Sequence, residues 1–254
     1  MRRRCCHNGV NEMFQAIKKM SPKQQACLAL FLILPAPLIG VSSSLLLPPI
    51  RPAGSNEIEI GKLIWFVAKI WLLLLPVAWM VWIDRESMSW SPTTKQGIVA
   101  GFVLAIPVSI VLFGTYWMAK GTLIDPDAKQ AIEQLDIASP ANFLIFALAM
   151  SLLNSLMEEY VWRWFVFTKL RVIAGVWPAI LLSAFFFTVH HVVIMWNFGS
   201  LSLVLLGSAG LFSGGIIWAW LYNRYNSIWP GWICHVAADA AIMWITWWII
   251  TGDC

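Results

Sequence analysis

Long apolar runs, separated by short polar or proline-containing stretches, make up most of this chain. An α-helix needs about 20 predominantly apolar residues to cross the hydrocarbon core of a bilayer. By that length the pattern predicts seven transmembrane helices, at residues 25–47, 62–83, 97–118, 142–165, 177–197, 200–222 and 228–250. The expected fold is therefore all-α, a polytopic transmembrane helical bundle with roughly six to eight spans.

The composition excludes a soluble globular domain. Of the 254 residues, 59% are hydrophobic and 12% are charged, and the mean hydropathy is +0.73. No long polar stretch remains for a second domain, so one helical bundle is expected. The net charge of +4 is modest and does not indicate nucleic-acid binding. The partners predicted at this level are the lipid bilayer and no nucleic acid.

The first 24 residues form a basic segment ahead of the first apolar run. A short amphipathic helix on the membrane surface is predicted there, because apolar residues recur at helical spacing: Val10, Met13, Phe14, Ile17 and Met20. The segment also carries six basic residues: Arg2, Arg3, Arg4, Lys18, Lys19 and Lys23. Alternate loops then carry further basic residues: Arg85, Lys95, Lys169, Arg171 and Arg224. The positive-inside rule predicts a cytoplasmic segment 1–24 and a C-terminus outside.

Ionisable residues inside the predicted spans are few, and most of them gather in three spans. The fourth span holds Glu158, Glu159 and Arg163 in the run EEYVWR. Arg163 lies four residues after Glu159, so the two can pair along the helix. Asn154, Glu158 and Trp162 are also four apart, which leaves Glu158 on another face, where a carboxylate could serve as a base. The alternative interpretation is a helix end with interfacial charges.

Histidines mark the other two spans. His190 and His191 are adjacent in the fifth span and point about 100° apart, so at most one is expected to face the glutamate helix. His235 and Asp239 are four apart in the seventh span, where the carboxylate could orient the imidazole or bind a metal beside it. Each pair alone could be a buried polar contact.

Taken together, the three clusters predict one shared site. Charged groups at membrane depth are costly and usually face an interior or a wet cavity. All three clusters lie near the middle of their spans by residue count, and each needs partners that the others can supply. The residue types favour a hydrolytic or metal site within the membrane.

The order of these motifs resembles a known family. Glu-Glu-x-x-x-Arg, then Phe-x-x-x-His, then His-x-x-x-Asp on successive membrane helices is similar to the CAAX protease and bacteriocin-processing family, also called the type II CAAX prenyl endopeptidase or Abi family. The resemblance covers residues 141–250, which would form a CAAX-protease-like catalytic core. Residues 25–140 would supply three lead-in transmembrane helices.

The resemblance implies a role for each motif residue. Glu158 corresponds to the glutamate that activates water, Glu159 to its partner and Arg163 to the cation of the motif. His235 corresponds to the second histidine, and Asp239 stands where the family has Asn or Asp, so these two would stabilise the oxyanion.

The first histidine has two alignments. His191, with Phe187 four residues before it, is preferred because the preceding Ser-Ala-Phe-Phe-Phe run falls at the family's usual offset. His190, with Phe186 before it, fits the bare pattern equally well. In either alignment this histidine would help Glu158 to polarise the water.

No cofactor is certain from the sequence. The family has been described both as zinc metalloproteases and as metal-independent glutamate proteases. If a metal is bound, Glu158, His191 and His235 could hold zinc with an open position for water. The absence of His-Glu-x-x-His spacing on one helix favours a site without a tightly bound metal.

The function expected from the resemblance is an intramembrane endopeptidase. It would hydrolyse a peptide bond of a membrane-embedded or lipid-associated protein or peptide, in a bacterial inner (cytoplasmic) membrane. One alternative is a non-catalytic Abi-type bacteriocin immunity or scaffold membrane protein. A second is a membrane protein that ligates a cofactor through histidine or handles protons.

Overall fold

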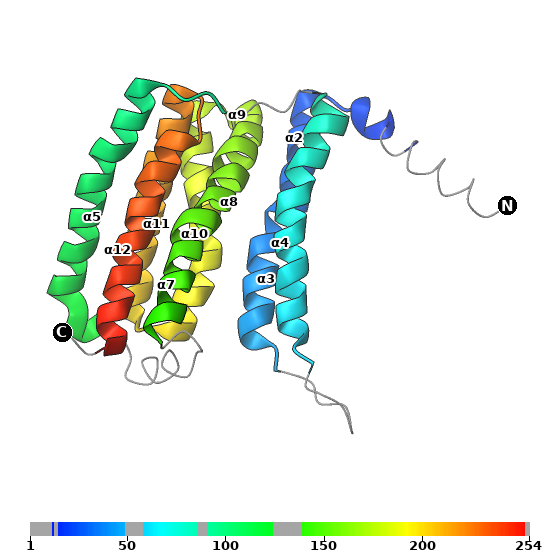
Figure 1. Cartoon of the computed structure of the whole chain (residues 1–254). Helices are drawn as coiled ribbons and strands as arrows, with labels where there is room; N and C mark the ends of the chain where they lie inside the picture. Colours follow the sequence, from blue (N-terminus) through cyan, green and yellow to red (C-terminus); the bar gives the residue numbers. More distant parts are fainter. Residues whose placement is uncertain (1–11, 13–14, 49–57, 86–90, 124–138, 252–254) are drawn as a thin grey trace. The chain divides into compact units, whose positions relative to one another are not determined.

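The structure is a computed structural model, and it describes residue 12 and residues 15–48, 58–85, 91–123 and 139–251 (Figure 1). Most of the predicted N-terminal amphipathic helix lies outside the described residues, including Val10, Met13 and Phe14. Arg2, Arg3 and Arg4 lie outside them as well. Residues 15–18 are helical, and Ile17 is in this short piece.

The all-helical, seven-span prediction is confirmed. Within the described residues, seven helices are long and apolar enough to cross a membrane: Pro22–Leu46, Ile60–Asp84, Lys95–Leu123, Pro140–Ala174, Val176–Asn197, Leu201–Tyr225 and Trp229–Thr251. Their bounds agree with the predicted spans to within a few residues at most ends. The fourth helix is the exception, because it continues to Ala174, nine residues past the predicted end.

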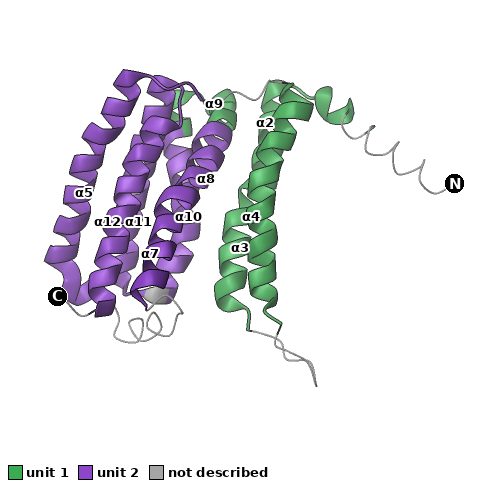
Figure 2. Ribbon diagram, viewed as in Figure 1, with its two compact units in different colours: residues 1–90, 168–179 green, residues 91–167, 180–254 purple. Residues whose placement is uncertain are grey.

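The helices fall into two compact units (Figure 2). Unit 1 holds α2 (Pro22–Ile33), α3 (Pro35–Leu46), α4 (Ile60–Trp79), η1 (Met80–Asp84) and α9 (Thr168–Ala174). Ser21 caps α2 by accepting a hydrogen bond from the backbone N–H of Gln24. Helices α3 and α4 pack closely at Gly61. A Cβ at this position would overlap the backbone at Ser43, so glycine allows the close approach. The ion pair between Lys169 and Asp84 (2.5 Å) ties α9 to η1.

Unit 2 contains the three helices that carry the predicted site. It holds α5 (Lys95–Leu123), α7 (Pro140–Leu148), η2 (Ala149–Asn154), α8 (Ser155–Glu159), η3 (Tyr160–Phe167), most of α10 (Val176–Phe198), α11 (Leu201–Tyr225) and α12 (Trp229–Thr251). Two glycines allow close helix packing. A Cβ at Gly101 would meet the Pro230 carbonyl of α12, and one at Gly215 would meet Ala184 of α10.

The fourth span is not a plain α-helix. Wide π-helical turns, η2 and η3, flank the short α-helical segment α8 that carries both glutamates. Single π turns are rare and are found mostly at functional sites. A hydropathy pattern cannot distinguish these turns from an α-helix, because they change the phase of the helix and not its apolar character.

Candidate active site

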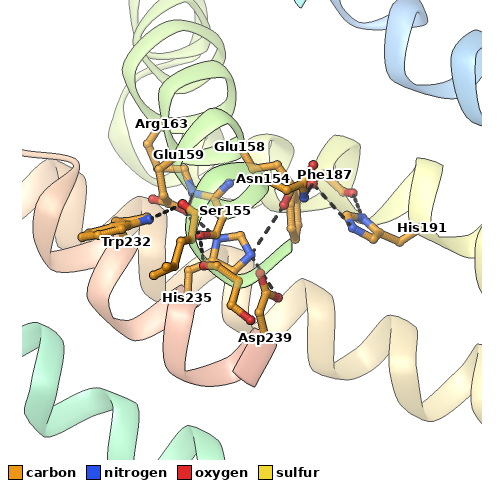
Figure 3. A network of polar contacts seen from close by, with 12 residues as sticks. Asn154, Ser155, Glu158, Glu159, Arg163, Phe187, His191, Trp232, His235 and Asp239 are labelled. Carbon is orange, nitrogen blue, oxygen red and sulfur yellow. Dashed lines mark hydrogen bonds and ion pairs between the residues drawn. The ribbon is translucent and has the colours of Figure 1, made fainter. Parts of the chain in front are cut away.

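Glu158 lies at the meeting point of the polar side chains in unit 2 (Figure 3). It projects from α8 and is buried. Asn154, one turn earlier at the end of η2, donates from Nδ2 to Glu158 Oε1 at 2.9 Å. The predicted shared face of Asn154 and Glu158 is thus present, and Asn154 holds the carboxylate in one orientation.

Two imidazoles approach the Glu158 carboxylate from different helices. His191 Nε2 of α10 lies 3.9 Å from Glu158 Oε1, and His235 Nε2 of α12 lies 3.5 Å from Oε2. His191 Nδ1 lies 2.9 Å from the carbonyl oxygen of Phe187, to which it can only donate. In a neutral ring this leaves the lone pair on Nε2, directed toward Glu158.

Glu159, the second glutamate of the motif, contacts His235 at its Nδ1 atom. Glu159 Oε1 lies 3.0 Å from His235 Nδ1 and 3.4 Å from Arg163 Nε, and the side chains of Glu159 and Arg163 are 0% exposed. The predicted pairing of Glu159 with Arg163 along the helix is present. Asp239 Oδ1 lies 3.7 Å from the other ring nitrogen, Nε2. The carboxylate that orients His235 through Nδ1 is therefore Glu159, and Asp239 faces the nitrogen that also faces Glu158.

Aromatic rings enclose this charged cluster. Trp218 of α11 stacks on His235, with ring centroids 3.8 Å apart and planes 13° apart. The Arg163 guanidinium carbon lies 5.1 Å from the Trp218 ring and 4.8 Å from the Phe187 ring. Cation–π contacts of this kind stabilise a desolvated guanidinium by roughly 2 kcal/mol. Trp218 thus contacts both Arg163 and His235, and Phe187 contacts Arg163.

Comparison with known protein families gives a match in the region that carries this cluster. The family model described as type II CAAX prenyl endopeptidase Rce1-like matches residues 140–241. This match supports a CAAX-protease-type domain over residues 140–241. The match supports CAAX-type intramembrane protease activity in the broad sense, and with the seven apolar helices it makes the chain an integral, multi-pass membrane protein. No curated protein and no solved structure matches the chain significantly.

The matched CAAX protease region contains every site residue predicted from the sequence: Glu158, Glu159, Arg163, His191, His235 and Asp239. The structure brings all six into one connected polar cluster (Figure 3). Sequence reasoning gave no role to Trp218, since one tryptophan among many in apolar spans is expected to be an interfacial anchor.

The expectation that only one of the two adjacent histidines faces the glutamate helix was wrong. Single ligand atoms of Glu158, His190 and His191 all lie within 4.8 Å of one another. The helical spacing sets the direction of each Cα–Cβ bond, but the two imidazoles then lean together, with centroids 4.0 Å apart. Among the described residues, this trio is the group that could hold a metal ion. His235, a member of the predicted ligand set, is not part of it.

Gly231 of the CAAX protease domain is a position where only a hydrogen atom fits. A Cβ there would lie 2.5 Å from Glu159 Oε2 and 3.3 Å from its Cδ. We expect Gly231→Ala to push Glu159 away from His235, costing about 1–3 kcal/mol of stability through overpacking and lowering activity. Thermal unfolding of the purified protein, together with its cleavage rate, measures both effects.

Gly210→Ala is the matched control for this change. Gly210 lies in α11, and a Cβ there would meet nothing within 4 Å. That variant should be neutral or slightly stabilised, because alanine is the better helix former. If both variants behaved alike, Gly231 would have no steric role at Glu159.

Proposed function

We propose that this chain is an intramembrane endopeptidase in which Glu158 activates the attacking water. The observation that carries the proposal is the convergence of His191 and His235 on the buried Glu158 carboxylate, at 3.9 and 3.5 Å. General bases are carboxylates or imidazoles positioned within reach of the proton that they remove. Asn154 supports this role by fixing Oε1 of Glu158.

In the proposed reaction, Glu158 takes a proton from a water molecule placed between it and His191. The resulting hydroxide attacks the carbonyl carbon of the substrate, and the negative charge passes to the carbonyl oxygen. Collapse of the tetrahedral intermediate breaks the C–N bond, and the proton held by Glu158 passes to the leaving amine. One carboxylate, that of Glu158, therefore both accepts the proton from water and delivers it to the leaving amine.

His235 is the proposed donor to the oxyanion. In its imidazolium form both ring nitrogens carry a proton: Nδ1 donates to Glu159, and Nε2 is available to the oxyanion. Before substrate binds, this N–H would face two carboxylate oxygens, Glu158 Oε2 at 3.5 Å and Asp239 Oδ1 at 3.7 Å. With His235 as the donor, Asp239 need not contact the oxyanion. An ionised Asp239 carboxylate would repel the oxyanion.

A carboxylate with imidazoles is a donor set that zinc accepts, and zinc bound at such a set would supply a Lewis acid. The roles given to Glu158, His191 and His235 are those of the chain's own groups, and each stands without a metal.

The substrate we propose is a membrane-embedded or lipid-associated protein or peptide, since the polar cluster lies on helices that cross the membrane. We further propose that the protein lies in a bacterial inner membrane with its N-terminus in the cytoplasm. The basic residues before the first span and in alternate loops support this orientation.

The test compares native host membranes containing the wild-type chain with membranes containing Glu158→Gln. Proteomics of new N- and C-termini should find peptides that occur only with the wild type. If both folded proteins gave identical sets of termini, the non-catalytic immunity or scaffold function would replace the protease. A visible absorption band of the purified protein would instead favour a haem-ligating function.

A further inference from the structure

Glu158, His190 and His191 form a three-ligand cluster that the proposed hydrolysis does not fully use. One ligand atom from each lies within 4.8 Å of the other two. Glu158 and His190 are buried, and His191 is partly exposed. One carboxylate and two imidazoles are ligands that divalent zinc prefers.

The two rings are already oriented for binding. His191 donates Nδ1–H to the Phe187 carbonyl at 2.9 Å, the arrangement by which proteins fix a metal-binding histidine and leave Nε2 for the metal. His190 is held by stacking on Trp162, with centroids 5.6 Å apart and planes 4° apart. Its edge also meets Phe187, at 5.9 Å and 84°.

We propose that this trio is an inhibitory site for a divalent transition-metal ion, with Zn²⁺ as the preferred occupant. The inhibition rests on the proposed function, because the metal would occupy the carboxylate that activates water. Zinc bonds of about 2.0–2.2 Å in a tetrahedral site place neighbouring ligand atoms about 3.3–3.6 Å apart. His191 Nε2 and Glu158 Oε1 are 3.9 Å apart and all three ligand atoms lie within 4.8 Å of one another, so side-chain rotations that bring these atoms closer would complete the site.

The remaining groups explain why the bound ion inhibits. A catalytic zinc needs an open position and, commonly, a separate base. With Glu158 taken as a ligand, Glu159 cannot replace it as the base, since it is held by His235 at 3.0 Å and Arg163 at 3.4 Å. His235 does not belong to the trio and contacts Glu158 through the other carboxylate oxygen, Oε2.

The first test measures the binding of Zn²⁺ to the full chain, purified in detergent without a histidine tag. Calorimetry should give one zinc per chain, and His190→Gln should weaken the affinity at least about 10-fold. His235→Gln is the matched control and should retain the wild-type affinity within about 3-fold. Unfolding temperatures recorded without zinc verify that both variants fold, and His191→Gln replaces His190→Gln if the latter does not.

The second test follows cleavage as zinc is added. The wild type should lose activity as the site fills, and His190→Gln should require at least about 10-fold more zinc for the same fractional loss. Absence of zinc binding, equal weakening by His235→Gln, or activity that a chelator abolishes and zinc restores would each overturn the proposal. Because zinc binding is measured independently of cleavage, a chain that binds zinc but cleaves nothing would refute the protease and leave the metal site standing.

Discussion

Glu158→Gln should lower the cleavage rate of a purified membrane substrate by about 10²–10⁴-fold, the usual contribution of a general base. Glutamine has nearly the same shape, and its amide oxygen can still accept the hydrogen bond that Asn154 now donates at 2.9 Å. It cannot accept the proton of the attacking water. The loss should therefore fall on kcat, and the unfolding temperature should stay close to that of the wild type.

Glu59→Gln provides the same chemical change at a site outside the cluster. Glu59 pairs with Lys62 at 2.6 Å, and both side chains are largely exposed, so this variant should cleave at the wild-type rate. Cleavage by Glu158→Gln within a few-fold of Glu59→Gln would remove Glu158 from the proposed reaction.

Arg163→Met should be the most destabilising of the substitutions considered for this site. The guanidinium is fully enclosed, and the buried carboxylate of Glu159 would keep only His235 as a partner. Breaking a buried ion pair by removing one partner costs about 3–5 kcal/mol. Unfolding followed by helical content during titration with a denaturing detergent would measure the loss.

The double variant Glu159→Gln with Arg163→Met separates charge from packing. It removes both charges, while the amide oxygen of the introduced glutamine can still accept a hydrogen bond from His235. We expect it to recover more than half of the stability lost in Arg163→Met alone, because no charge is left without a partner. Equal instability of the single and double variants would show that Arg163 acts through its contacts with Phe187 and Trp218.

Hydropathy was sufficient to predict the seven spans, since span length and apolar character are properties of the sequence alone. It placed the fourth span at 142–165, whereas the helix continues to Ala174. The added residues include Lys169 and Arg171, and a hydropathy pattern ends at such charges. The helix continues because α9 packs against α2 and Lys169 pairs with Asp84, both of which are tertiary contacts.

Motif spacing predicted six side chains that the structure brings into one polar cluster, but it left their pairing undetermined. The pairing of Glu159 with Arg163 was predicted from their spacing and is present, and Asn154 shares with Glu158 the helical face that their spacing predicts. Contacts between helices could not be derived in this way. The bond between Glu159 and His235 and the stacking of Trp218 on His235 depend on how α8, α11 and α12 pack together.

The π-helical turns on either side of α8 give the fourth span a further property. A π turn contains more residues than an α turn, so the facing of Glu158 and Glu159 depends on how many residues η2 and η3 contain. Deleting one apolar residue from η3 would leave composition and hydropathy almost unchanged, yet it would turn the two parts of the helix by about 100° relative to each other. The geometry of the candidate site therefore depends on the number of residues in this span, a dependence that only insertions and deletions would test.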